Sequence, residues 1–97
     1  MKKTYIILYD DMEPTLEEKF LEAIRSVYIS KLGRRNMIII VEESGHDEKE
    51  IFNNINSNID FNPDFLVALF ESYYGFYNKG VIEWLKKHFP KSEWYEK

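Results

Sequence analysis

The sequence predicts an α+β fold in which the elements follow the order strand, helix, strand, strand, helix, strand, with an additional helix at the C-terminal end. Two observations lead to this prediction. Apolar segments rich in β-branched and aromatic residues, which favour strands, recur at 4–9, 37–41 and 65–70. Between them, apolar residues recur every three or four positions, which is the period of an amphipathic helix. A chain of 97 residues has the length of one domain, and we expect that domain to span 1–97.

The first strand is predicted at 4–9, and the first helix follows it directly. Pro14 and Thr15 signal a helix start, and Thr15 and Glu18 have the spacing of a capping box, in which each side chain accepts a free backbone N–H. The helix is expected to end between Ser26 and Ile29. Its apolar face is expected to contain Leu16, Phe20, Ile24 and Val27.

The stretch VYISKLGRRNMIIIVEE, residues 27–43, has two interpretations. Residues 27–29 favour a strand and Gly33 supplies a turn, so we expect a hairpin that pairs 27–32 with 37–41. In the alternative interpretation, residues 27–32 continue the first helix, and the sheet has one strand fewer.

A second helix is predicted after Gly45. Asp47 is the expected N-cap, and Glu50 follows it three residues later. The apolar stripe of this helix is expected to consist of Ile51, Ile55 and Ile59. Pro63 ends this unit of the chain.

The C-terminal part of the sequence contains one more strand and one more helix. DFLVALFE, which starts at Asp64, is a nearly continuous apolar run of the kind found in central strands. A last helix is predicted from about Lys79 to Phe89, where Pro90 ends it.

This is the ferredoxin-like βαββαβ order with one added helix. Two helices cover only one face of such a sheet, whereas the strands at 4–9 and 65–70 are apolar on both faces. Either the last helix or a second protomer must cover the other face. We expect that face to carry Tyr5, Ile7, Tyr9, Val67 and Leu69. The prediction is a homodimer built from the sheet face or its edge together with the C-terminal aromatic segment.

Composition excludes several classes of protein. Without cysteine, the chain has no disulfide framework, zinc ribbon or thiol nucleophile, which is compatible with a cytoplasmic location. No segment approaches the ~20 apolar residues of a membrane span, so we expect no membrane association. The net charge of −4 disfavours nucleic acid as the main partner, because nucleic-acid binding relies on a basic face.

Asp10 and Asp11 end the first strand and raise the question of a metal site. Adjacent strand residues point to opposite faces, so a hard cation would need Asp10 from each of two protomers, or Asp10 with a distant acid such as Glu42. In the other interpretation, both acids form a solvated strand end before a helix N-terminus, where negative charge is favourable. We therefore expect no catalytic residue, metal ligand or cofactor, with Asp10 and a Mg²⁺ or Mn²⁺ ion as the alternative. His46 and His88 show no triad spacing.

Two clusters are candidates for binding. Arg34 and Arg35, at the predicted hairpin tip, either grip a phosphate with their guanidinium groups or keep an exposed turn soluble. The second cluster is aromatic and contains Tyr73, Tyr74, Phe76, Tyr77, Trp94 and Tyr95. Aromatic side chains stack on unpaired bases, but on an acidic chain they favour the core or a protein interface.

The run DFLVALF, followed after a Tyr/Gly segment by VIEWLKKHF, resembles the C-terminal part of small bacterial and phage proteins of the SinR-like family. These belong to the ferredoxin-fold superfamily of the small CRISPR spacer-acquisition protein and the VapD toxins. The first strand, which ends in YDD, is similar to the opening strand of that superfamily. The resemblance implies a dimer, and it matches Asp10 to an acid proposed in nuclease members to bind a divalent metal across the dimer interface. Many members are non-catalytic scaffolds.

Three functions fit these observations. The preferred hypothesis is a non-enzymatic module that binds a protein partner, and the resemblance adds a phage or mobile-element setting in which the chain inhibits a host defence complex. The first alternative is a divalent-metal-dependent nuclease that uses Asp10, with Arg34 or Arg35 holding the substrate backbone. The second is a small-ligand regulatory sensor with its ligand at a dimer groove, which rests on fold analogy alone.

Overall fold

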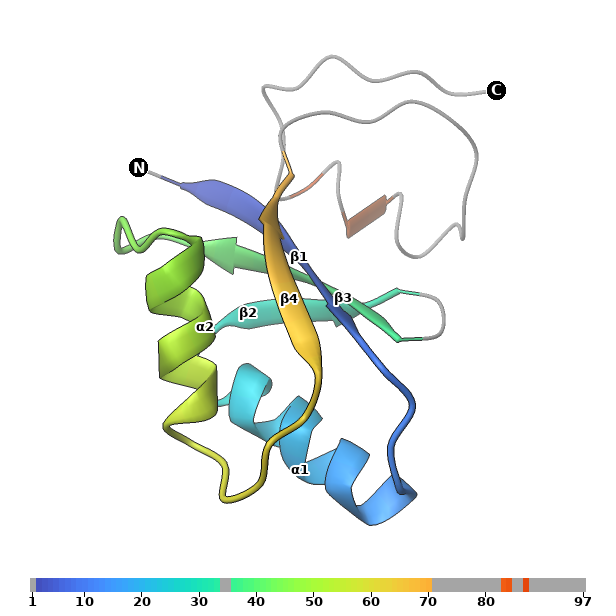
Figure 1. Cartoon of the computed structure of the whole chain (residues 1–97). Helices are drawn as coiled ribbons and strands as arrows, with labels where there is room; N and C mark the ends of the chain where they lie inside the picture. The colour runs from blue at the N-terminus through green and yellow to red at the C-terminus, as the bar shows by residue number, and fades with distance from the viewer. Residues whose placement is uncertain (1, 34–35, 71–82, 85–86, 88–97) are drawn as a thin grey trace.

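Four strands and two helices follow one another along the described part of the chain, in the order that the sequence predicts (Figure 1). The computed structural model describes residues 2–33, 36–70, 83–84 and 87. The elements are β1 (Lys3–Tyr9), α1 (Pro14–Arg25), β2 (Ile29–Leu32), β3 (Met37–Glu42), α2 (Glu48–Asn56) and β4 (Phe65–Leu69). The predicted α+β fold with a ferredoxin-like element order is confirmed.

The strands form one antiparallel sheet in the spatial order β2-β3-β1-β4. β1 lies in the interior, where Ile7 opposes Ile38 of β3 on one side and Val67 of β4 on the other. Each helix therefore connects strands that are not neighbours. α1 joins β1 to β2 across β3, and α2 joins β3 to β4 across β1.

β2 and β3 form the hairpin that is the preferred interpretation of residues 27–43, although β2 begins at Ile29 and not at residue 27. The alternative of a longer first helix is wrong, because α1 ends at Arg25. At the hairpin end, the Gly33 N–H donates to the Met37 carbonyl at 2.8 Å, and Asn36 takes a left-handed conformation with φ 60°. Asparagine tolerates this conformation better than most residues.

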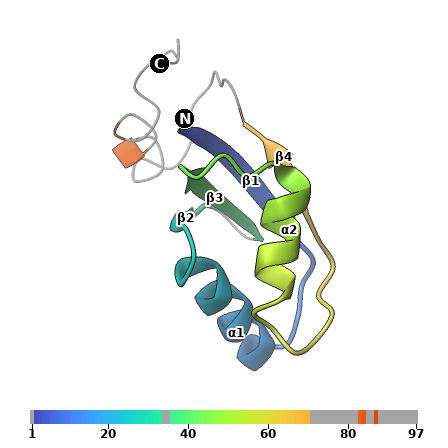
Figure 2. The ribbon, with the colours of Figure 1, turned by 90° about the vertical axis from the view of Figure 1, so that its left-hand side faces the viewer.

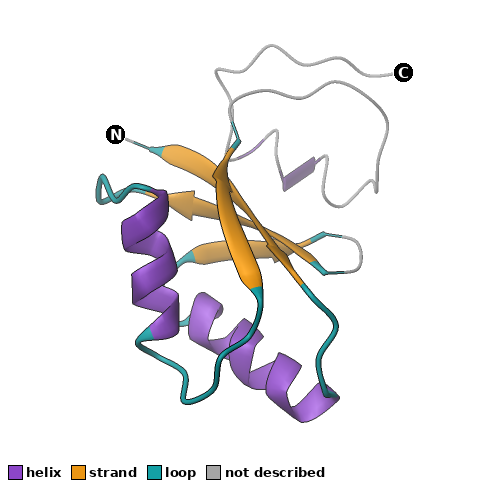
Figure 3. Ribbon diagram, in the orientation of Figure 1, coloured by secondary structure: helices purple, strands orange, loops and turns teal. Residues whose placement is uncertain are grey.

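Both helices pack on the same side of the sheet, so the elements that the structure describes form two layers (Figures 2 and 3). Aromatic rings join the layers: Phe20 of α1 lies 5.1 Å from Tyr9 and 5.1 Å from Phe65, measured between ring centroids. Phe52 of α2 stacks on Phe65 at 4.4 Å. The buried core between the layers consists of Tyr5, Ile7, Tyr9, Phe20, Ile24, Tyr28, Ile38, Ile40, Ile51 and Ile55.

The expectation that Tyr5, Ile7 and Tyr9 lie on an exposed sheet face is wrong. Their exposed fractions are 1%, 0% and 5%, because they face the helices. Val67 and Leu69 share that face, as cross-strand partners of Ile7 and Tyr5. Both alternating sets of side chains are apolar, so the pattern alone does not say which set the helices cover. Strand register and the handedness of the helical crossovers decide it.

The capping predicted at the two helix starts has different outcomes. Asp47 caps α2 as predicted, since its Oδ1 accepts from the Glu50 N–H at 2.9 Å and Glu50 Oε1 accepts from the Asp47 N–H at 3.0 Å. The predicted box of Thr15 and Glu18 is wrong, because α1 already begins at Pro14 and its N-cap makes no side-chain hydrogen bond. A proline at the first helical position presets the helical φ, and its missing N–H is one that would have no partner within the helix.

The predicted helix faces are confirmed in part. Phe20 and Ile24 of α1 are buried, but Val27 lies beyond the helix end and is 43% exposed. On α2, Ile51 and Ile55 are both fully buried, but Ile59 lies beyond the helix end at Asn56 and is partly buried.

The additional helix predicted at 79–89 falls largely outside the described residues. The described residues of that segment, Glu83, Trp84 and Lys87, have helical backbone.

Candidate functional site

The sheet has a second face, which neither α1 nor α2 covers, and we call it the open face. Its side chains alternate along each strand with those that face the helices. They belong to Thr4, Ile6, Leu8, Ile29, Lys31, Met37, Ile39, Val41, Leu66 and Ala68. Within this set Lys31 is the one charged residue, so the open face is almost entirely apolar.

Large apolar side chains on the open face remain exposed. Leu8 and Leu66 oppose each other directly across the β1–β4 ladder and are 44% and 51% exposed, and Ile29 is 49% exposed. Ile39 and Val41 are buried. Fully burying a leucine or isoleucine contributes about 1.5–3 kcal/mol, so covering each half-exposed side chain contributes about 1 kcal/mol. Exposed apolar patches on sheets mark interaction sites for proteins, membranes or ligands when they are large.

The binding residues predicted from the sequence lie outside the described part of the chain. They are Arg34, Arg35, Tyr73, Tyr74, Phe76, Tyr77, Trp94 and Tyr95. The sequence did not single out Leu8, Leu66 and Ile29. The sequence did show that the side chains of these strands alternate between two faces. Both alternating sets are apolar, so the sequence does not indicate which set forms the core.

Asp10 is exposed directly after β1. Its backbone N–H donates to the Asp64 carbonyl at 3.0 Å, and the neighbouring Asp11 Oδ1 accepts a hydrogen bond from Asn36 Nδ2 at 2.8 Å. Among the residues that the structure describes, no group of three or more His, Cys, Asp or Glu side chains is placed to hold a metal ion. Metal binding at Asp10 would therefore need donors from elsewhere, such as a second protomer.

Glu42, the suggested distant partner of Asp10, lies at the other end of the sheet. It pairs with Lys3 at the beginning of β1. The strand distance from Lys3 to Asp10 is about 23 Å at ~3.3 Å per residue. The two carboxylates of one chain therefore cannot share an ion, and this option is wrong.

Glu42 is instead the centre of a buried polar cluster. Glu42 is 3% exposed, and its Oε1 accepts hydrogen bonds from the backbone N–H groups of Ser44 and His46. Its Oε2 lies 3.3 Å from His46 Nδ1. These contacts close the loop between β3 and α2, where Gly45 has φ +86°, a left-handed conformation that glycine favours. Because a buried carboxylate requires such donors, Glu42 organises this loop.

An asparagine and two tyrosines extend the Glu42 cluster. Asn54 Nδ2 donates to the Tyr28 hydroxyl at 3.2 Å and lies 3.2 Å from His46 Nδ1. The Tyr5 hydroxyl donates to the His46 carbonyl at 3.1 Å. Burial raises the pKa of the Tyr5 phenol and that of the Tyr28 phenol above their ordinary value. The cluster joins β1, α2 and the segment before β2, and its contacts are structural.

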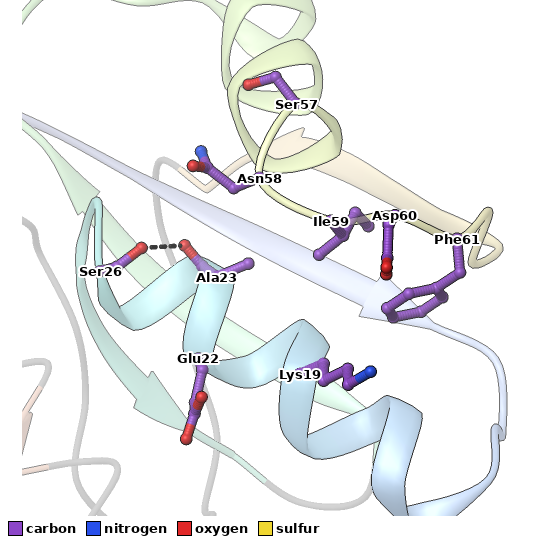
Figure 4. Close-up of a pocket in the computed structure, with 9 residues that line it drawn as sticks. All are labelled: Lys19, Glu22, Ala23, Ser26, Ser57, Asn58, Ile59, Asp60 and Phe61. Carbon is purple, nitrogen blue, oxygen red and sulfur yellow. Dashed lines mark hydrogen bonds between the residues drawn. The ribbon is translucent and has the colours of Figure 1, made fainter.

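A surface groove of about 740 Å³ lies between α1 and the connection from α2 to β4 (Figure 4). Ser26 Oγ donates to the Ala23 carbonyl at 2.8 Å, and Ser57 Oγ donates to the Asn54 carbonyl at 2.9 Å. Both hydroxyl protons are therefore used within the helix ends and are not available as donors to a ligand in the groove. Its lining consists of Lys19, Glu22, Ala23, Ser26, Ser57, Asn58, Ile59, Asp60 and Phe61.

None of the helices in the described part of the chain is long and apolar enough to cross a lipid bilayer. No protein-family model, curated protein or solved structure matches this chain.

Proposed function

We propose that this chain is a non-enzymatic interaction module that binds a protein partner through the open face. The observation that carries the proposal is the cross-strand pair of half-exposed leucines, Leu8 and Leu66, on a face that neither helix covers. Association with another protein removes such apolar surface from water, which is the main favourable term in most protein complexes. A rigid sheet also presents the two leucines in a fixed arrangement, so little ordering is needed on binding.

The partner surface is expected to be apolar, with a carboxylate near Lys31. Lys31 is in register with Ile39, which in turn opposes Ile6, so apolar residues neighbour its position on the open face. The stem of a lysine covers apolar surface while its ammonium group takes an opposite charge. Such a pair contributes more to the orientation of the partner than to affinity.

The resemblance to SinR-like proteins supports a phage or mobile-element setting, in which the partner is a host defence complex that the chain inhibits. The lack of cysteine supports a cytoplasmic location, and the charge of −4 supports a protein partner over nucleic acid. A homodimer is part of the same proposal, because twofold dimers are the commonest oligomers.

The test is co-purification from the native host, followed by affinity measurement with the purified partner. Leu8→Thr and Leu66→Thr keep strand propensity but remove apolar surface. Leu32→Thr is the matched control, since Leu32 is 51% exposed like Leu66 but faces the helix side of the sheet. We expect the dissociation constant to rise about tenfold or more for the first two variants and to stay unchanged for the control.

Two results would contradict the proposal. One is the absence of any recovered protein partner when the folded chain is used as bait. The other is a partner that all three threonine variants bind as tightly as the wild type, which would place its contact surface elsewhere.

A further inference from the structure

The outer edge of β4 carries backbone groups that no strand pairs within the described part of the chain. The Asp10 N–H donates to the Asp64 carbonyl at 3.0 Å, and the Phe70 N–H donates to the Thr4 carbonyl at 2.9 Å. Bonding alternates along an antiparallel ladder, so the even-numbered residues of β4 bond to β1. The odd-numbered residues direct their N–H and C=O groups away from the sheet. They are Phe65, Val67 and Leu69.

Two features by which sheets often protect their edges, charged side chains and proline, do not occur within β4. β4 reads Phe-Leu-Val-Ala-Leu, without charge or proline, and it follows β1 in an unbroken register. The opposite edge strand, β2, has four residues and includes Ser30 and Lys31. Lysines on an edge strand hinder unwanted strand pairing. The contrast points to β4 as the edge that receives another strand.

β4 is also held rigidly from the helix side. Phe65 stacks on Phe52 at 4.4 Å and contacts Phe20 edge-on at 5.1 Å, as measured between ring centroids. Val67 packs against the buried core. A strand that is already fixed loses little conformational entropy when it pairs.

We propose that β4 pairs antiparallel with β4 of a second copy of this chain, about a twofold axis at Val67. Such an axis places Val67 opposite Val67 of the partner subunit, and Phe65 opposite Leu69 of the partner subunit. The outward N–H and C=O groups of both strands then bond to each other, because they are evenly spaced about Val67. Only apolar side chains meet across the junction, so the strand is complementary to itself. The product is a continuous sheet with the four strands of each copy.

This inference rests on the homodimer of the proposed function and adds the place where it forms. In an antiparallel ladder, opposed residues share a face, so Leu66 lies on the same face as Ala68 of the partner subunit. Both open faces therefore lie on one side of the joined sheet. The dimer leaves Leu8 available to a protein partner.

Sedimentation of the full chain at micromolar concentration tests the inference with a pair of proline variants. Val67→Pro removes an outward N–H and leaves the ladder with β1 intact, and proline is tolerated on edge strands. Ser30→Pro is the matched control, because the Ser30 N–H points outward from the β2 edge. We expect the wild type and Ser30→Pro to sediment as dimers, with twice the 11.7 kDa mass of one chain. Val67→Pro is expected to sediment as an 11.7 kDa monomer.

A second variant and a second measurement guard against misfolding of Val67→Pro. Ala68→Lys keeps every backbone donor and adds a charge at an exposed position of the edge, and it is expected to weaken self-association at least tenfold. In the wild type, amide hydrogen exchange at Val67 and Leu69 should be at least tenfold slower at dimer-forming concentration than in dilute solution.

Two outcomes overturn the inference. One is the mass of a single chain at every concentration. The edge of β4 would then be occupied by solvent or by another segment of the same chain. The other is a dimer that persists in both β4 variants with fast exchange at Val67, which would place the dimer interface elsewhere and leave the interaction module intact. Conversely, an edge-paired dimer that binds no protein would refute the proposed function alone.

Discussion

Ile7 and Leu8 are adjacent on β1, yet Ile7 is fully buried beneath the helices and Leu8 is 44% exposed on the open face. The difference follows from the alternation of side chains across a strand. Every position of β1 from Tyr5 to Tyr9 is apolar. One set of these residues therefore stabilises the fold, and the other remains available for contact with a partner.

Truncation of Ile7 and truncation of Leu8 should lower the free energy of unfolding by different amounts. Ile7→Ala is expected to lower the free energy of unfolding by about 2–5 kcal/mol, because it leaves a cavity in a packed core. Leu8→Ala should lower it by less than about 1 kcal/mol, since the side chain is half exposed already. Urea unfolding followed by circular dichroism measures both values. Equal losses would show that the open face is part of the core.

The carboxylate of Glu42 should contribute substantially to stability. Glu42→Gln weakens charge-assisted hydrogen bonds from the backbone of Ser44 and His46 at a buried position, and is expected to destabilise the chain by about 1–3 kcal/mol. Glu43→Gln, at the adjacent exposed position, should change stability by less than about 0.5 kcal/mol. Comparable unfolding midpoints for the two variants would contradict the role of Glu42 in this loop.

Alanine substitution at Asp47 and at Thr15 compares the capped start of α2 with the start of α1, which has no side-chain cap. Asp47→Ala is expected to cost about 0.5–2 kcal/mol, because the Glu50 N–H loses its acceptor. Thr15→Ala lies within α1 and should shift stability by no more than about 0.5 kcal/mol. Thermal and urea unfolding both report these differences. A larger loss for Thr15→Ala than for Asp47→Ala would mean that α1 is capped at Thr15 after all.

Stability should fall in the alkaline range because of Tyr9. Burial, together with a 2.8 Å hydrogen bond to Glu17 Oε2, raises the pKa of Tyr9 from 10.0 to about 12. Above pH 10 the unfolded chain loses this proton before the folded chain does, so the free energy of unfolding decreases as pH rises from about 10 to 12. Below pH 10 the contribution is fully present. Urea unfolding across this pH range measures the decrease.

Tyr9→Phe provides the control for this pH dependence. Other tyrosines, including Tyr5 and Tyr28, also have raised pKa values and contribute in the same direction. The Tyr9 contribution is therefore the difference between wild type and variant. We expect a shallower decline in the variant, and a missing phenolate transition near pH 12 in its ultraviolet absorbance titration. Identical pH slopes for the two proteins would contradict the assignment.

The element order and the α2 cap were predictable because they depend on residues that are close in the chain. Asp47 and Glu50 are three positions apart, and Gly33 marks the hairpin between two apolar runs. The start of α1 was less predictable, because Pro14 and Thr15 each suit a helix beginning. The local sequence there is compatible both with Pro14 as the first helical residue and with Thr15 as the N-cap.

The candidate surface was not predictable at the level of single residues. The sequence established that both faces of the sheet are apolar, and therefore that two helices leave one apolar face to be covered in some other way. Only the tertiary structure decided that Ile6, Leu8 and Leu66 occupy that face, while Tyr5, Ile7 and Tyr9 enter the core. The physical reason is that a shift of one residue in register exchanges the two faces, and register depends on long-range pairing. The outer contacts of the Glu42 cluster have the same origin, since they join Tyr5 to His46 and Asn54 to Tyr28, which are distant in the sequence.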